Sequence, residues 1–180
     1  RNRGKTFTSV TTDRLIEDMR AQKPDHIVVT GDLVNIALEA EFEGARRFLE
    51  QLGDPNDVTV IPGNHDAYVP GALESFNTHC APYIHSDDGS TTYPVARKRG
   101  PVEIVGLSSA IATAPFMATG EVSAQQLKRL RETLASPTED FRLVLVHHPP
   151  FESATRWHKR LTNVEQVKPA LKGADLVLHG

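Results

Sequence analysis

Four consecutive residues, Gly-Asn-His-Asp at positions 63–66, have the clearest potential for chemistry in this sequence. They follow residues 58–61, a β-branched stretch that predicts a buried strand, and a Pro-Gly pair ends that strand. Asn64, His65 and Asp66 are therefore expected at the carboxyl end of a strand, where open α/β sheets bind ligands. An amide oxygen, an imidazole and a carboxylate in a row are typical of a cation site with a proton-transfer residue beside it. The same residue types are also common in plain turns, which is the alternative interpretation.

Two further strand ends carry side chains of the same kind. Asp32 follows the strand-like stretch 26–30 and a glycine, and His147 directly follows the apolar stretch 141–146. Because parallel strands of one sheet bring their carboxyl ends to one edge, we expect Asp32, Asn64 and His147 to converge. A carboxylate, an amide oxygen and a neutral imidazole suit Mn²⁺, Fe or Zn²⁺ better than Ca²⁺ or Mg²⁺. Each residue alone is explained by a turn, whereas the three together predict a metal site.

Strand and helix patterns alternate along the chain. Strands are predicted at 26–30, 58–61, 92–96, 102–107, 141–146 and 175–178, and helices at 8–22, 71–81 and 162–171. In the first helix, the apolar residues Leu15, Ile16 and Met19 recur at helical spacing. Two further helices, each with one apolar face, are predicted from Phe42, Ala45, Phe48, Leu49 and Leu52, and from Leu127, Leu130 and Leu134. This alternation predicts an α/β fold with a largely parallel core and one hairpin. The three basic residues at 97–99, between the hairpin strands, are interpreted as a solvated tip.

The composition predicts a single globular domain, residues 1–180. The formal net charge of −3 comes from interspersed charges of both signs, so no nucleic-acid-binding surface is indicated. No apolar run reaches the ~18 residues that span a bilayer, and no signal-peptide pattern follows the first residues. One cysteine, Cys80, rules out an internal disulfide and fits a reducing compartment, so a cytoplasmic protein without a membrane association is expected.

One short motif points to a different class of protein. Gly4-Lys5-Thr6 matches the end of a phosphate-binding loop, whose first glycine and preceding strand would fall before residue 1. A polar loop before a helix is the preferred interpretation, and a P-loop nucleotide-binding protein is the alternative.

The spacing of these motifs resembles a known family. Gly31-Asp32 followed by Asn35, then the motif at 63–66, then His-His-Pro-Pro at 147–150 is similar to the calcineurin-like metallophosphoesterases, over essentially the whole chain. The resemblance implies two packed mixed β-sheets flanked by helices in four layers, α/β/β/α. It also implies two metal ions (Mn, Fe or Zn) at the sheet ends and a small phosphoester substrate.

The resemblance assigns metal ligands to this chain. It implies that Asp32 bridges both metals and that Asn64 and His147 complete the second metal site. His147 is chosen over His148 because the family ligand comes first after the strand. His148 is then expected either to hold the metal-binding side chains in place without binding the metal itself or to contact the substrate.

The resemblance also assigns the catalytic residues. His65 is expected to donate a proton to the leaving oxygen or to stabilise charge on the phosphoryl group, while Asp66 fixes its tautomer and raises its pKa. The nucleophile is expected to be a metal-bound hydroxide.

Two parts of the family pattern are absent. No Asp-x-His motif stands at a strand end upstream of Asp32, and the family's Gly-His-x-His does not appear after the last predicted strand. His179 precedes Gly180 instead of following it, so we do not expect it to be a ligand. The chain is therefore expected to lack the family's first strand and carboxyl-terminal part, to lack most ligands of the first metal and to be inactive alone.

The substrate and the role of the fold are less determined by the sequence. Hydrolysis of a phosphomonoester or phosphodiester, including a cyclic nucleotide, is the leading hypothesis, and a non-catalytic scaffold that keeps the fold is the alternative. Specificity is expected from the loops at 113–120 and 151–161, where Arg156, Trp157 and His158 are positioned to contact phosphate and base. A solvated loop with one packed tryptophan is the other interpretation.

Overall fold

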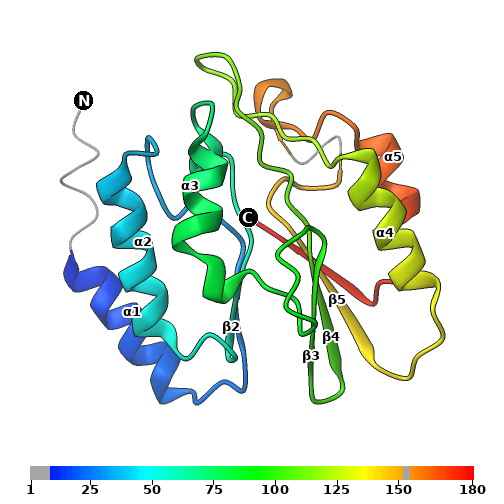
Figure 1. Cartoon of the computed structure of the whole chain (residues 1–180), viewed down its shortest axis with the longest axis horizontal. Coiled ribbons are helices and arrows are strands. Elements are labelled where there is room, and N and C mark those ends of the chain that lie inside the picture. Colours follow the sequence, from blue (N-terminus) through cyan, green and yellow to red (C-terminus); the bar gives the residue numbers. More distant parts are fainter. Residues whose placement is uncertain (1–8, 152–154) are drawn as a thin grey trace.

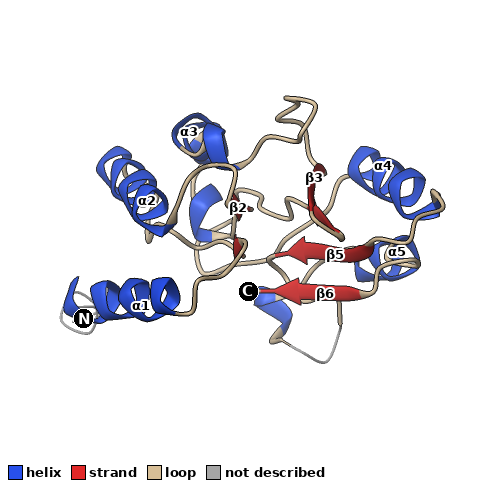
Figure 2. Ribbon diagram, turned by 90° about the horizontal axis from the view of Figure 1, so that it is seen from below, coloured by secondary structure: helices blue, strands red, loops and turns tan. Residues whose placement is uncertain are grey.

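Two β-sheets lie between two groups of helices in the computed structural model, which describes residues 9–151 and 155–180 (Figure 1). Helices α1, α2 and α3 lie on one side of the strands and α4 and α5 on the other, and the view turned by 90° agrees (Figure 2). The predicted α/β architecture of two packed sheets flanked by helices is confirmed. Gly4-Lys5-Thr6 lies outside the described residues.

The first sheet has two parallel strands, β1 and β2, covered by three helices. The elements are α1 (Ser9–Ala21), β1 (Ile27–Val29), α2 (Glu39–Leu52), β2 (Val58–Val60), a short 3-10 helix (His65–Ala67), α3 (Ala72–His79) and a second 3-10 helix (Ala81–Tyr83). The predicted inward face of α2 is largely confirmed, because Phe42, Ala45, Leu49 and Leu52 are buried. Among the α1 residues whose burial is described, Ile16 alone is buried, whereas Leu15 at the neighbouring position is 53% exposed.

The second sheet has four strands in the order β3-β4-β5-β6. Its elements are β3 (Val95–Arg99), β4 (Val102–Gly106), α4 (Ala124–Ala135), β5 (Phe141–Val146), a 3-10 helix (Trp157–Lys159), α5 (Val164–Ala170) and β6 (Leu176–His179). β3 and β4 form the predicted antiparallel hairpin, while β4, β5 and β6 are parallel. The buried residues Leu127, Leu130 and Leu134 of α4 pack against β4 and β5, as predicted.

The two sheets face each other through apolar side chains. Ile61, Ile104 and Leu145 are buried between them, whereas Val58 and Val60 face the helices on the other side of β2. Alternate residues of a strand point to opposite faces, so one short strand contributes to two apolar layers. No helix in the described part of the chain is long and apolar enough to cross a membrane.

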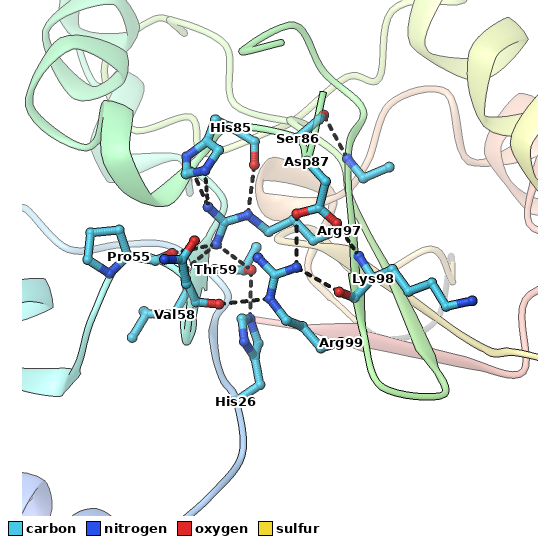
Figure 3. A network of polar contacts seen from close by, with 12 residues as sticks. His26, Pro55, Val58, Thr59, His85, Ser86, Asp87, Arg97, Lys98 and Arg99 are labelled. Carbon is cyan, nitrogen blue, oxygen red and sulfur yellow. Dashed lines mark hydrogen bonds and ion pairs between the residues drawn. The ribbon is translucent and has the colours of Figure 1, made fainter. Parts of the chain in front are cut away.

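Arg97 joins the two sheets, which corrects the interpretation of residues 97–99 as a solvated tip (Figure 3). It lies in β3, is only 1% exposed, and donates to carbonyl oxygens of Pro55 (2.8 Å) and Val58 (2.7 Å) beside the first sheet. It also donates to the carbonyl oxygens of His85 (2.7 Å) and Pro82 (3.3 Å). The hairpin turn consists of residues 100 and 101, so β3 carries the guanidinium inward.

The buried guanidinium is satisfied by carbonyl oxygens, not by a carboxylate. Among the residues that the structure describes, Arg97 makes no ion pair. Burial and the nearby charge of Arg99 lower the pKa of Arg97. A buried charge is tolerated only where hydrogen bonds replace its hydration, so removal of the guanidinium leaves several buried acceptors without partners.

We predict that Arg97→Met lowers the free energy of unfolding by roughly 3 kcal/mol or more, because the lost donors leave buried carbonyl oxygens unpaired. Lys98→Met is the matched control, since the Lys98 side chain is 62% exposed and pairs only with Asp140. It is expected to cost less than about 1 kcal/mol in urea denaturation. Equal losses in the two variants would contradict the role assigned to Arg97.

His26 lies beside this cluster and gives a pH-dependent prediction. Its Nε2 is 2.8 Å from the hydroxyl of Thr59, and burial, Arg99 and Arg97 together lower its pKa to about 4. The folded state therefore binds fewer protons than the unfolded state between about pH 4 and the ordinary histidine pKa of about 6.5. The contribution of His26 to stability is present above that range and is lost as the pH falls.

We expect His26→Gln to reduce the fall in unfolding free energy between pH 7 and pH 4.5 by roughly 1–2 kcal/mol. His179→Gln, at an exposed histidine, is the control. Identical pH profiles for wild type and His26→Gln in chemical denaturation would show that His26 contributes nothing to the pH dependence.

Candidate metal centre

Three predicted ligand atoms converge where the two sheets meet. The Nε2 atom of His147 lies 3.2 Å from Oδ1 of Asn64 and 3.5 Å from Oδ1 of Asp32. The prediction that one sheet brings them together is wrong, because Asp32 and Asn64 follow β1 and β2 whereas His147 follows β5 of the other sheet. The residues meet because the sheets pack face to face with the carboxyl ends of these strands on one side.

The orientation of His147 is fixed by a backbone carbonyl. Its Nδ1 atom is 2.7 Å from the carbonyl oxygen of Thr30, which only accepts hydrogen bonds, so Nδ1 carries a proton. In a neutral ring, Nε2 then presents its lone pair to Asp32 and Asn64. Metal-binding histidines commonly donate their other ring nitrogen to a carbonyl or carboxylate in this way. Thr30 could not be identified from the sequence, because every residue has a carbonyl oxygen.

This donor set fits a metal ion. In a neutral His147, Nε2 carries a lone pair and faces Oδ1 of Asn64 and Oδ1 of Asp32, which also carry lone pairs. Because no hydrogen atom lies between Nε2 and these oxygens, the arrangement favours a cation bound to all three. A carboxylate oxygen, an amide oxygen and an imidazole nitrogen are ordinary ligands for divalent transition metals. Among the described residues, no group of three or more His, Cys, Asp or Glu side chains is placed to hold a metal, so the amide of Asn64 is needed to complete the set.

Asp66 links the loop after β1, which carries Asp32, to the loop after β2, which carries Asn64. Its fully buried carboxylate accepts four backbone N–H groups, with Oδ2 bonded to Asp32 (2.8 Å) and Gly63 (2.7 Å) and Oδ1 to Leu33 (3.0 Å) and Val34 (3.2 Å). Burial raises the pKa of Asp66 to about 6, and the hydrogen bonds oppose this rise. The loop after β1 and the loop after β2 therefore share one carboxylate.

The predicted contact between Asp66 and His65 is wrong. Both carboxylate oxygens of Asp66 are occupied by backbone donors, and the Nδ1 atom of His65 instead lies 2.6 Å from the carbonyl oxygen of Asn35. That carbonyl fixes the His65 tautomer, and the ring stacks on Tyr68 with a centroid distance of 5.8 Å. The backbone N–H of His65 donates to Oδ1 of Asp32 (2.9 Å), so the ring stands beside the candidate ligands.

Gly63 is required by the close approach of these groups. A Cβ atom at this position would lie 2.3 Å from Oδ1 of Asp32 and 2.8 Å from Cε1 of His147, which is closer than real Cβ atoms come. The glycine of the sequence motif therefore has a steric role: it allows the β2 loop to pack directly against two ligand side chains.

His148 faces the interior of the protein. It is 2% exposed, its Nδ1 lies 2.7 Å from the hydroxyl of Ser109 and its Nε2 lies 3.1 Å from the carbonyl oxygen of Ala118. Burial and the neighbouring His147 lower its pKa to about 4, so the ring is neutral at neutral pH. Both ring nitrogens are engaged with protein groups, so the interpretation of His148 as a substrate contact is wrong. Its ring meets that of His147 edge-on, with centroids 5.0 Å apart.

Trp157 lies on the protein surface. It is 70% exposed, so the interpretation of a packed tryptophan is wrong, and residues 152–154 of its loop lie outside the described residues.

His179 is exposed at the end of β6, while the N–H of Gly180 donates to the carbonyl oxygen of His147 (3.0 Å). The carboxyl end of β6 thus lies at the candidate metal centre.

The chain is similar in sequence to known phosphoesterases. The model of the family described as calcineurin-like phosphoesterase matches residues 8–180. A cAMP/cGMP dual specificity phosphodiesterase of Mycobacterium tuberculosis is 32% identical over 135 residues, which is 73% of this chain and 38% of that protein. A glycerophosphodiester phosphodiesterase of Enterobacter lignolyticus is 30% identical over 129 residues, 72% of this chain and 43% of that protein. The chain thus spans about two fifths of the length of these relatives.

We predict that Asp66→Asn destabilises the protein by roughly 3 kcal/mol, because the amide nitrogen would face backbone donors that lose their acceptor. The same variant should weaken Mn²⁺ binding about tenfold, although Asp66 is not a ligand, because it orients the loops that carry the ligands. Asp88→Asn, at an exposed carboxylate that accepts one backbone N–H, is the matched control. Calorimetry and Mn²⁺ titration followed by electron paramagnetic resonance measure both effects, and unchanged Mn²⁺ affinity in Asp66→Asn would refute the orienting role.

Proposed function

The chain belongs to the calcineurin-like phosphoesterase family, and we propose that the protein it represents hydrolyses a phosphodiester or phosphomonoester with the help of divalent metal ions. The observation that supports this most directly is the convergence of Asp32, Asn64 and His147, with His65 tethered to Asp32 through its backbone N–H. Phosphoester hydrolysis needs positive charge near the phosphoryl oxygens and a proton for the leaving group. A metal ion held by the first three residues would supply the positive charge, and His65 would supply the proton.

A metal ion would be held by residues that follow strands of both sheets. Asp32 and Asn64 would offer oxygen atoms, and His147 would offer Nε2 because Nδ1 donates its proton to the carbonyl oxygen of Thr30. When bound, a divalent ion would supply positive charge to the phosphoryl group and lower the pKa of bound water. For the whole protein we propose two metal ions of the Mn, Fe or Zn type, both of which Asp32 would help to hold.

His65 is proposed as the general acid. Because Nδ1 donates to the carbonyl oxygen of Asn35, Nε2 is the ring nitrogen available for proton transfer. During hydrolysis, a water molecule releases one proton to the solvent and its oxygen forms a bond to phosphorus as the bond from phosphorus to the leaving oxygen breaks. The Nε2 proton of a protonated His65 then passes to that oxygen, and the neutral ring keeps its bond to Asn35.

A small phosphodiester is the proposed substrate. Both relatives described above are named for phosphodiesterase activity, one on cyclic AMP and cyclic GMP and the other on glycerophosphodiesters. A cyclic nucleotide is our finer proposal, since the exposed aromatic and basic side chains around Trp157 suit a base and a phosphate.

The proposed metal requirement is tested with bis(4-nitrophenyl) phosphate and Mn²⁺ on the full-length protein. We expect hydrolysis that chelation abolishes and Mn²⁺ restores. Asn64→Ala is expected to lower kcat roughly 100-fold or more, since one ligand is lost. Asn77→Ala, away from the ligands in α3, serves as the control. Undiminished turnover in Asn64→Ala or after chelation would exclude this site as the metal centre.

The general-acid role of His65 is tested by comparing two substrates whose leaving groups differ in their need for a proton. We expect His65→Gln to lower kcat roughly 100-fold or more for an alkyl ester, whose leaving oxygen needs a proton. The loss should be much smaller for the 4-nitrophenyl ester of the same phosphate, because 4-nitrophenolate leaves without protonation. An equal loss with both esters would show that His65 acts in another way.

A further inference from the structure

Two loops beside the candidate metal centre form one structural unit. The N–H of Ala118 donates to the carbonyl oxygen of His158 (2.8 Å) and that of Gly120 to Arg160 (3.1 Å). Gly120 also accepts from the N–H of Thr162 (2.8 Å), and it forms an isolated parallel bridge with Leu161. The segment before Gly120 and the segment before Thr162 are therefore fixed side by side, and we call residues 113–120 and 155–161 the paired loops.

The paired loops are anchored to the candidate metal centre by His148. Its Nε2 is 3.1 Å from the carbonyl oxygen of Ala118 in one loop, and its ring packs edge-on against the candidate ligand His147. Gly120 makes this possible, since a Cβ at that position would lie 2.1 Å from Nδ1 of His148. The backbone of the paired loops at Ala118 and Gly120 is thus held next to the candidate ligand His147.

The paired loops present unusually exposed aromatic rings. Phe116 is 97% exposed and Trp157 is 70% exposed. Phe116 also has a φ of 68°, a left-handed conformation that a bulky side chain rarely adopts. Residues in such strained conformations gather at ligand-binding sites, where the surrounding structure holds them in place. Nothing in the packing of the described core requires either ring.

The same unit carries unbalanced positive charge. Arg156, Lys159 and Arg160 are exposed, and none of them makes an ion pair with a described residue. The described residues of the paired loops contain no Asp or Glu. The chain as a whole has a net charge of −3, so this concentration of positive charge is local. An anion is therefore attracted to this surface and not to the chain in general.

We propose that the paired loops form a nucleoside-phosphate subsite in which Trp157 and Phe116 stack on a base and the neighbouring cations bind phosphate. This inference rests on the proposed phosphoester hydrolysis and adds to it the residues that select the substrate. Exposed aromatic rings interleaved with Arg and Lys bind nucleotides by stacking and by charge. Trp157 and Phe116 are specificity-determining residues here, because they lie on loops joined to the candidate ligands by His148.

Binding is tested without catalysis, since Trp157 is the only tryptophan of this 180-residue chain. We expect AMP to quench its fluorescence saturably, ribose 5-phosphate to compete without quenching, and adenosine to bind much more weakly. Arg156→Ala should weaken AMP binding at least about fivefold. Arg14→Ala, at an exposed arginine of α1, should leave AMP binding unchanged. Absence of quenching by AMP, or a response only to phosphatidylglycerol vesicles, would overturn the proposal.

Specificity is tested on the full-length protein with two diesters that share one leaving group. Thymidine 5′-(4-nitrophenyl) phosphate should have a higher kcat/KM than methyl 4-nitrophenyl phosphate. Trp157→Ala should lower only the first value, by roughly 5- to 100-fold, and Trp157→Phe should restore most of it. Equal use of both diesters, unaffected by Trp157→Ala, would overturn the subsite. If neither diester is hydrolysed, the proposed function fails, while AMP quenching still reports on the subsite.

Discussion

The buried carboxylate of Asp66 is the interaction on which the candidate site depends. It gathers four N–H groups from the loops that follow β1 and β2, so the loop carrying Asp32 and the loop carrying Asn64 cannot move independently. The desolvation of this carboxylate is costly, and its pKa is raised, but the four donors offset the cost. Gly63 then lets the joined loops approach His147 from the opposite sheet.

Backbone carbonyl groups orient three imidazole rings around the site. Thr30 holds His147, Asn35 holds His65 and Ala118 holds His148. Each carbonyl fixes which ring nitrogen carries a proton and hence which nitrogen faces the site. In His147 and His65 the carbonyl engages Nδ1, so Nε2 is the ring nitrogen left for the roles proposed above. In His148 both ring nitrogens are engaged, and the ring connects the candidate ligand His147 to the paired loops.

The sequence was sufficient to predict the convergence of Asp32, Asn64 and His147, because strand-ending ligands in an α/β pattern constrain where side chains meet. The strand pattern by itself placed them on one sheet, since strand pairing depends on contacts between distant segments, whereas the family resemblance implied two packed sheets. The burial of Arg97 and the hydrogen-bond partners of Asp66 were mispredicted for a related reason. Arg97 donates to backbone carbonyl groups and Asp66 accepts from backbone N–H groups, and such partners cannot be recognised from residue types. Helical spacing likewise identified both Leu15 and Ile16, but packing alone decides which of them is buried.

We propose that a cation binds the lone pair on Nε2 of His147 together with Asp32 and Asn64, while Nδ1 keeps its proton and donates it to the carbonyl oxygen of Thr30. Histidine ¹⁵N nuclear magnetic resonance during a Zn²⁺ titration tests this directly. We expect the Nε2 resonance of His147 to move to the range of a metal-bound nitrogen and Nδ1 to stay protonated. Zn²⁺ binding that changes the resonances of other histidines and leaves His147 unaffected would contradict it.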